Sequence, residues 1–260
     1  MKSSPILSLC FAAALSIAAT LTVPAPAAAA EIKVLTAGAF KQVVVALVPA
    51  FEKETGHKVT VDNGTAGELQ KRIEGGEAFD VTVITPAVIE ALAGKGHIVR
   101  GSRVSLATVG VGVMVKAGAP KPDISSVEAF KKALLAAKTV AYIDPKSGGS
   151  SGVYIEKLID RLGVGDAVRA KARLKNGGYV ADLIVSGEAE LGLHQISEIV
   201  PVTGVTLVGP LPAEIQNVTS YAAGLSANAK DKDAAQALIK MFSGPAAAAL
   251  LKSKGMEPAS

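Results

Sequence analysis

The sequence predicts an α/β protein that folds as two lobes joined by long strands. Stretches typical of β-strands alternate with stretches typical of amphipathic helices on both sides of a long apolar run at 106–115. Such alternation favours a sheet covered by helices in each half of the chain. Turns rich in glycine, serine and threonine stand between strands and helices in both halves. We therefore expect one α/β unit in each half.

In the first unit, apolar residues recur at the spacing of one helix face between residues 40 and 53. The later stretch 80–84 is typical of a buried strand. Pro86 follows it, and proline is common in the first turn of a helix. The expected elements are strands at 31–36, 57–61 and 80–84 and helices at 40–53, 66–74 and 86–93.

The second unit begins after the glycine- and proline-rich break at 118–122. A serine, either Ser125 or Ser126, is expected to cap its first helix, which ends at Ala136. The elements that follow are strands at 139–143, 190–194 and 204–208 and helices at 151–162 and 180–186. The chain then closes with a strand at 220–225 and helices at 231–242 and 245–253.

Two long strands are expected to connect the lobes and to act as a hinge. One of them crosses near Gly112 and the other near Tyr221. The C-terminal helices then return to the first lobe. On this basis lobe 1 comprises residues 31–112 and 222–260, and lobe 2 comprises residues 113–221.

The first 30 residues are typical of a secretory signal peptide. A single lysine, Lys2, precedes an apolar run, and the Ala-x-Ala sequence at 28–30 fits signal-peptidase cleavage. Cleavage leaves Glu31 as the N-terminus of an exported protein and removes Cys10, the single cysteine of the chain. A mature chain without cysteine excludes disulfides, thiolate catalysis and cysteine-ligated metals. Retention of the apolar run as a membrane anchor is the alternative.

Charge and composition exclude several classes of partner. The chain carries 27 Lys and Arg against 23 Asp and Glu and is 4% aromatic. It has no long basic run, and this composition argues against binding of nucleic acid. Apart from the signal segment, no stretch is long and apolar enough to span a bilayer. No P-loop ending, no G-x-S-x-G elbow and no His/Asp/Glu cluster with metal-ligand spacing occurs, so we expect no metal and no cofactor.

Four strand-to-helix junctions carry groups suited to an anion. A helix start presents unpaired backbone N–H groups and the positive end of a dipole, and both attract negative charge. Ligands of α/β sheets bind where strands end and helices begin, so two junctions in each lobe would face one another across a cleft. An ordinary turn or a helix cap is the alternative for each junction by itself. The junctions are 36–40 with Gly38, 63–67 with Thr65, 147–163 with Ser147, Ser150 and Ser151, and 176–179 with two glycines.

His194 is the candidate acid–base residue because it ends the predicted strand 190–194, where the cleft is expected. An imidazole can take up and return a proton near neutral pH. A structural role for His194 is the alternative. His57 and His97 are expected at the surface, and Arg103 is expected either at the cleft rim or in solvent.

Over residues 31–260 the chain resembles the periplasmic molybdate-binding proteins of ABC transporters, a group of type II solute-binding proteins. The resemblance rests on the segments KVLTAGAF, LQKRIEGGEAFDVTV, SSGVYIEKLIDRLG and SGEAELGLHQISE. It implies the type II periplasmic binding-protein fold, in which two lobes close over a ligand by hinge motion. It also implies an ABC transporter permease as partner. We expect the protein to be a monomer.

In that family an oxyanion is held by serine hydroxyls, backbone N–H groups and one tyrosine hydroxyl, without a cation. Position by position, the two serines fall on Ala39 and Ala66, and the tyrosine falls on Gln195. A buried dianion that loses three donors is poorly satisfied. A ligand other than molybdate is therefore expected. The implied backbone contacts fall on Ser151 and on residues 177–178.

A second resemblance, carried by residues 101–132, is to the bacterial aconitate isomerases, exported enzymes on the same fold that shift an allylic proton of a tricarboxylate. It favours a carboxylate ligand. The predicted function is capture of a small anion, an oxyanion or a carboxylate, for an ABC-type transporter. An isomerase of a small tricarboxylate, with His194 moving the proton, is the alternative, and a sensor subunit without a transporter is a third. The expected substrate-binding residues are Gly38, Ala39, Phe40, Thr65, Ala66, Ser150, Ser151, Gly152, Gly177, Gly178, Tyr179, His194 and Gln195.

Overall fold

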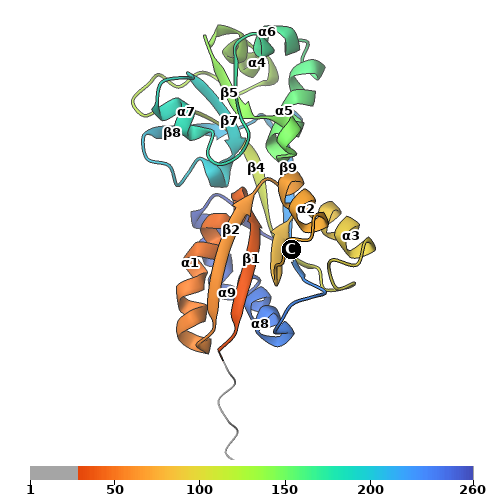
Figure 1. Cartoon of the computed structure of the whole chain (residues 1–260). Helices are drawn as coiled ribbons and strands as arrows, with labels where there is room; N and C mark the ends of the chain where they lie inside the picture. The colour runs from red at the N-terminus through yellow and green to blue at the C-terminus, as the bar shows by residue number, and fades with distance from the viewer. Residues whose placement is uncertain (1–28, 260) are drawn as a thin grey trace, which may run out of the picture.

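The computed structural model describes residues 29–259, and these form two lobes that lie one above the other in Figure 1. The predicted signal peptide, apart from Ala29 and Ala30, lies outside the described residues. Within the described range, strands from both lobes join into one ten-stranded sheet, and helices pack on it in each lobe. The predicted α/β fold of two lobes is confirmed.

The lower lobe of Figure 1 is built around a strand that leads directly into a long helix. That helix is amphipathic, and its Phe40 ring meets the ring of Phe242 edge to face in the lobe's core, with centroids 6.1 Å apart. The strands of this lobe are β1 (Glu31–Ala37), β2 (Lys58–Gly64), β3 (Val81–Ile84), the first part of β4 (Val104–Lys116), β9 (Val218–Leu225) and β10 (Glu257–Pro258). Its helices are α1 (Gly38–Thr55), α2 (Ala66–Glu74), α3 (Pro86–Gly94), α8 (Lys232–Phe242) and α9 (Pro245–Ser253).

The upper lobe also consists of a sheet covered by helices, and its sheet is smaller. Its core contains the fully buried side chains of Phe130 and Tyr142, and the Tyr142 hydroxyl donates to Glu156 at 3.0 Å. The strands are the last part of β4, β5 (Val140–Ile143), β6 (Ala172–Lys175), β7 (Leu191–Gln195) and β8 (Val205–Pro210). The helices are α4 (Val127–Ala136), α5 (Ser150–Arg161), α6 (Gly165–Arg169) and α7 (Ala181–Val185).

The sheet directs the carboxyl ends of its parallel strands from both lobes toward the space between them. In the lower lobe β1 pairs in parallel with β2 and β3, and in the upper lobe β5 pairs in parallel with β6 and β7. The strand order is β2-β1-β3-β9-β4-β7-β5-β6, with β8 and β10 also paired to β4. Helices α1 and α2 begin just after β1 and β2 end, and α5 follows β5 after a short 3-10 turn. Three helix starts therefore lie at the junction of the lobes.

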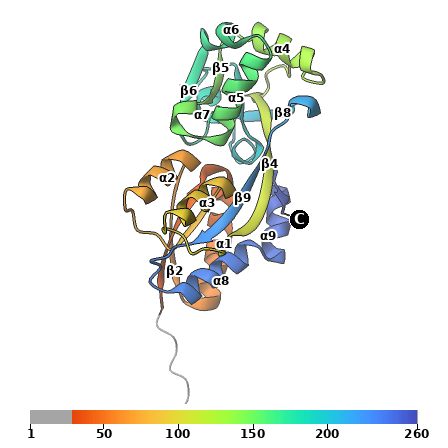
Figure 2. The same cartoon turned by 90° about the vertical axis from the view of Figure 1, so that its right-hand side faces the viewer.

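Strand β4 belongs to both lobes, and Figure 2 shows it beside β9. It pairs with β9 over residues 104–110 and with β7 and β8 over residues 111–116. The crossover predicted near Gly112 lies at this change of partners. Gln216 fixes the backbone of β4 where it changes partners. Its Oε1 accepts from the Val111 N–H at 2.9 Å, and its Nε2 donates to the Val111 carbonyl at 3.0 Å.

The returning crossover runs from Ile215, in the core of the upper lobe, to Tyr221, in the core of the lower lobe. The lower core draws on residues 32–109 and 221–256, and the largest upper core on residues 111–215. The predicted lobe boundaries, 31–112 with 222–260 and 113–221, stay a prediction.

The structure contains short elements that the sequence did not predict. Strand β6 lies at the sheet edge and exposes Arg173 and Leu174, so it lacks the apolar alternation of a half-buried strand. Helix α6 has five residues, too few to show a helical period. Within residues 29–259, no single helix has the length and apolarity of a membrane span; α8 and α9 together meet both criteria but are bent by 52° at the break between them.

Candidate functional site

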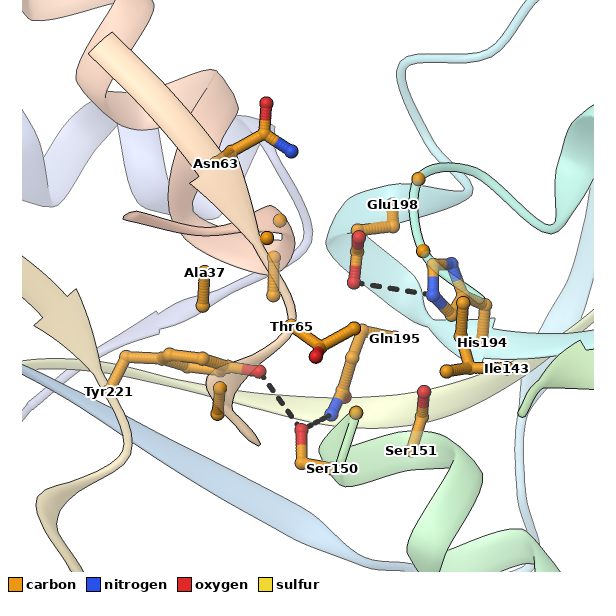
Figure 3. A pocket seen from close by; sticks show the side chains of 17 residues that line it. Ala37, Asn63, Thr65, Ile143, Ser150, Ser151, His194, Gln195, Glu198 and Tyr221 are labelled. Carbon is orange, nitrogen blue, oxygen red and sulfur yellow. Dashed lines mark hydrogen bonds and ion pairs between the residues drawn. The ribbon is translucent and has the colours of Figure 1, made fainter. Parts of the chain in front are cut away.

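A cleft lies between the two lobes, and elements of both line it (Figure 3). The cleft holds about 400 Å³ of space free of atoms, counting the part that is open to solvent. The lining residues are Ala37, Gly38, Ala39, Asn63, Gly64, Thr65, Ala66, Ile143, Gly149, Ser150, Ser151, Gly177, Gly178, His194, Gln195, Glu198 and Tyr221.

Most of the predicted substrate-binding residues lie in this cleft, and three do not. Phe40 is fully buried in the core against Phe242. Gly152 packs against the backbone of Ile143 so closely that a Cβ there would overlap the Ile143 carbonyl oxygen. Tyr179 points its hydroxyl at Gln42 Nε2, 2.5 Å away. In the structure these three residues position the cleft walls rather than line them.

The start of α1 forms one wall. Strand β1 ends at Ala37 and the helix begins at Gly38, so the chain turns without a loop. Alanine has no side-chain acceptor, and within the described chain no side chain caps this helix. The first backbone N–H groups of a helix have no intrahelical partner. Ala39, where the resembling family has a serine, therefore leaves backbone N–H groups as the donors of this wall.

The start of α5 forms the opposite wall, and it too has no side-chain cap within residues 29–259 because its N-cap is Gly149. Ser150 Oγ lies 3.2 Å from the Tyr221 hydroxyl and accepts from Gln195 Nε2 at 3.2 Å. Ser151 is buried beside it. The predicted donors Ser150 and Ser151 thus sit at an uncapped helix start, with one of the hydroxyls held in a fixed network (Figure 3).

Ser147 takes no part in this wall. Its hydroxyl donates to the Asp144 carbonyl at 2.8 Å, within the turn that precedes α5. Its own carbonyl accepts from the Thr65 hydroxyl, which comes from the other lobe. Gly67 N also donates to the Gly148 carbonyl at 3.2 Å. Two backbone segments from opposite lobes therefore meet here, and the structure has a closed cleft.

The Thr65 hydroxyl caps helix α2, and this differs from its expected role as a side-chain donor to the ligand. Its Oγ accepts from the Glu68 N–H at 3.1 Å, while Glu68 reaches back to the Thr65 N–H, so the two residues form a capping box for α2. The same hydroxyl gives its proton to the Ser147 carbonyl. Its remaining function is to fix the wall and the interlobe contact.

Replacing Thr65 with alanine is expected to lower the free energy of unfolding by about 1 kcal/mol, because the cap of α2 is lost. Urea denaturation of both proteins measures the difference. Thr65→Ser is the matched control, since it keeps the hydroxyl and should stay near the wild-type value. An alanine variant as stable as the wild type would show that the capping box contributes nothing.

Glu198 and Tyr221 line the cleft and were not among the predicted site residues. Glu198 ends the short 3-10 turn Ile196–Glu198 that follows β7, four residues after His194. The spacing of four residues from His194 and the position just after a strand end are the sequence features that could have identified Glu198 as a site residue. Tyr221 was expected only as a hinge residue, and β9 carries its side chain into the lower core with the hydroxyl toward Ser150.

His194 and Glu198 form a buried pair. His194 Nε2 lies 3.4 Å from Glu198 Oε2, and the two residues are 1% and 7% exposed. Burial lowers the pKa of His194 to about 3, with a smaller effect of Lys175 in the same direction. Burial raises the pKa of Glu198 to about 8 against an opposing attraction by Lys41. At neutral pH both side chains are therefore uncharged.

The remaining polar groups of the cleft are also uncharged. Burial raises the pKa of Tyr221, and Glu198 acts in the same direction, so the phenol keeps its proton. Gln195 donates from Nε2 to the Thr219 hydroxyl at 3.0 Å, while its Oε1 is buried without a partner in the described chain. Among the described residues, no lysine or arginine lines the cleft. The site offers a negative ligand hydrogen bonds and helix dipoles instead of a counter-cation.

Other residues considered in the sequence lie elsewhere. Arg103 pairs with Glu90 at 2.8 Å, so it does not reach into the cleft. His57 accepts from the Ala30 N–H at 3.0 Å and is half-buried rather than free in solvent. His97 is also half-buried. Among residues 29–259, no group of three or more His, Cys, Asp and Glu side chains is placed to hold a metal ion.

Comparison with known proteins gives consistent matches over nearly the whole described chain. A family described as bacterial extracellular solute-binding protein matches residues 32–257. An aconitate isomerase from Pseudomonas sp is 31% identical over 254 residues, which cover 94% of this chain and 95% of that protein. The molybdate-binding protein ModA of Azotobacter vinelandii is 29% identical over 236 residues, covering 88% and 90% of the two chains.

Solved structures of the same architecture include the periplasmic molybdate-binding protein of Azotobacter vinelandii, with a TM-score of 0.74, 24% identity, and coverage of 88% of this chain and 100% of that chain. The sulfate-binding protein SubI from Mycobacterium tuberculosis gives a TM-score of 0.71 at 18% identity, covering 89% and 88%. These matches confirm the resemblances expected from the sequence and the predicted fold class.

Proposed function

This chain belongs to the bacterial extracellular solute-binding proteins, and we propose that it captures a small anion in the cleft between its lobes. One observation carries the proposal. The uncapped starts of α1 and α5, which come from opposite lobes, open onto a single cleft whose described lining has no Lys or Arg. Backbone N–H groups and helix dipoles at such starts bind anions without a counter-cation.

We propose a small carboxylate as the ligand in preference to molybdate. Ala39, Ala66 and Gln195 stand where the resembling molybdate-binding proteins have hydroxyl groups, so a tetrahedral dianion would lack donors here. A carboxylate presents two oxygens in one plane, which the backbone N–H groups of two helix starts and the Ser150 hydroxyl can approach. The Pseudomonas relative named for aconitate is consistent with a ligand of this class.

The proposal includes export and delivery. The family's extracellular description agrees with a signal peptide cleaved before Glu31 and with a periplasmic protein. Proteins with two lobes release a ligand when they open about their crossover strands. We propose that this chain, as a monomer, hands the anion to an ABC-type permease.

A thermal-shift screen of the mature chain, residues 31–260, tests the proposal. The probes are molybdate, tungstate, sulfate, phosphate and a set of di- and tricarboxylates. A carboxylate present at 100 times its Kd should stabilise the folded state by about 2.7 kcal/mol, which corresponds to roughly 5–10 °C in Tm for a chain of this size. If no anion in the panel raises the Tm, the proposal is wrong.

Ser150→Ala is expected to weaken binding of the best anion about tenfold, because one hydroxyl donor and the network to Tyr221 and Gln195 are lost. Calorimetric titration gives the two Kd values. Ser186→Ala is the matched control, since the Ser186 hydroxyl is exposed and bonds only within its own turn. Equal affinity of the Ser150 variant and the wild type would remove this hydroxyl from the site.

The uncharged His194–Glu198 pair favours a second candidate function, isomerisation of a small tricarboxylate by an allylic proton shift. A neutral imidazole can accept a proton from one carbon, and a protonated carboxyl beside it can return one to another. Interconversion of trans- and cis-aconitate by the purified mature chain tests this function. Turnover that His194→Ala abolishes would contradict a purely binding role. Tight aconitate binding without turnover would contradict the isomerase.

A further inference from the structure

We propose that Glu198 binds the ligand as a hydrogen-bond donor: its carboxyl group keeps its proton in the free cleft and, through that O–H, donates a hydrogen bond to the bound anion. The inference rests on the proposed function and adds a property to it. The cleft would select a fully ionised small anion and, at alkaline pH, would take up one proton for each anion bound.

The position of the carboxyl group carries this inference. Glu198 Oε1 lies directly over the first residue of α1, where a Cβ on Gly38 would collide with it. This is the same helix start that offers its free N–H groups to the ligand. Figure 3 shows the Glu198 side chain reaching into the pocket beside His194. A ligand bound at the start of α1 must therefore contact this carboxyl group.

An ionised carboxylate at this position would repel every anion that the cleft is built to hold. A protonated carboxyl group instead has one O–H donor, and an O–H bond to a charged oxygen is among the stronger hydrogen bonds. The Glu198 side chain is 9% exposed, and burial disfavours its charged form. The conflict between a buried acid and an anion site disappears when the acid is neutral.

The proton is not already committed to the neighbouring imidazole. The distance of 3.4 Å between Glu198 Oε2 and His194 Nε2 exceeds that of a normal hydrogen bond. The other groups acting on the pair are Lys41 from α1, Lys175 from β6 and the Tyr221 hydroxyl from β9. Lys41 favours ionisation of Glu198, but burial outweighs it and raises the pKa of Glu198 to about 8.

Titration of the ligand-free mature chain tests the first half of the inference. Carbon-13 carboxyl NMR follows each glutamate, and Glu198→Gln identifies the Glu198 signal by its loss. The expected midpoint is near pH 8, and it should move higher when trans-aconitate or molybdate is added at saturation. A midpoint near the ordinary value of 4.5 in the free protein would overturn the inference, whether or not either probe binds.

Calorimetry with the same probes tests whether the proton on Glu198 takes part in anion binding. In buffers of different ionisation enthalpy, binding at pH 6 should take up no proton and binding at pH 9 about one. The affinity should fall about tenfold per pH unit above pH 8. Glu198→Gln keeps a donor but cannot titrate, so its affinity should not show this fall. Binding at pH 9 without proton uptake would overturn the inference and leave the proposed function standing.

If neither probe nor any other anion of the thermal-shift panel binds, the proposed function fails, and the NMR midpoint still decides whether Glu198 keeps its proton. Circular dichroism of Glu198→Gln verifies that the variant folds. Glu198→Asp provides a second variant: it still titrates but withdraws the carboxyl group from α1, so binding should weaken while proton uptake at pH 9 decreases. Full uptake in Glu198→Gln would assign the proton to another group and overturn the inference.

Discussion

Replacing Gly67 with alanine is expected to weaken binding of the anion by roughly 10- to 100-fold. In the closed cleft a Cβ on Gly67 would lie 2.8 Å from Gly148 Cα in the opposite lobe, and a backbone atom cannot move aside as a side chain can. Overpacking of this kind costs about 1–3 kcal/mol, and here the cost falls on the closed state. Gly67 lies in the first turn of α2, where alanine is favoured over glycine, so the helix itself is not weakened.

Calorimetric Kd values for the wild type and the Gly67 variant measure this effect. The matched control is Gly94→Ala, because Gly94 is also in a helix of the lower lobe and a Cβ there meets nothing within 4 Å. The control should bind like the wild type. Wild-type affinity in the Gly67 variant would show that ligand binding does not require the contact between Gly67 and Gly148.

Replacing Gly152 with alanine is expected to lower the free energy of unfolding by about 3 kcal/mol. A Cβ at this position would overlap the Ile143 carbonyl oxygen, so helix α5 would have to move away from strand β5. Both elements lie in a close-packed core in which displaced backbone is costly. Urea denaturation followed by circular dichroism gives the difference.

Gly177→Ala is the control for this second prediction. Gly177 also lies near the cleft, but its nearest neighbour would be a Thr65 methyl group at 3.9 Å, an ordinary van der Waals contact. That variant should unfold within about 1 kcal/mol of the wild type. A Gly152 variant that is equally stable would mean that α5 can shift on β5 without cost.

Gly152 shows which part of the site could be predicted from the sequence and which part could not. The turn from β5 into α5 was recognised from its serines and glycines, and Ser150 and Ser151 do line the cleft. Gly152 was grouped with them as a binding residue, yet it serves the packing of α5 on β5. Sequence spacing identifies a helix start, but it does not distinguish a glycine that faces a ligand from one that faces a neighbouring strand.

The fold could be predicted more completely than the site, because most of its helices and strands are indicated by a pattern of apolar residues that repeats along the sequence. The apolar face of α1 and the buried residues of β3 and β5 each span several positions, and such patterns define the element. Strand β6 was missed because its exposed edge carries no such pattern. The pairing of β4 with partners in both lobes follows from tertiary contacts that no local signal contains.

Glu198 and Tyr221 are the cleft residues that could least be predicted from the sequence. Each is a single residue whose role depends on burial against elements far away in the chain: Glu198 against the start of α1, and Tyr221 against Ser150. A lone acid after a strand is indistinguishable in sequence from a solvent-exposed one. Its raised pKa follows from its burial in the folded protein, which no local sequence feature indicates.

A crystal structure of the mature chain with trans-aconitate or the best carboxylate of the screen tests the central claim most directly. We predict one ligand per chain in the interlobe cleft, with carboxylate oxygens at the N–H groups of Ala39 and Ser151 and at the Glu198 carboxyl. The lobes should be closed, with Gly67 against Gly148 as in the present structure. A ligand bound outside this cleft, or one that leaves the starts of α1 and α5 without an anion, would contradict the account.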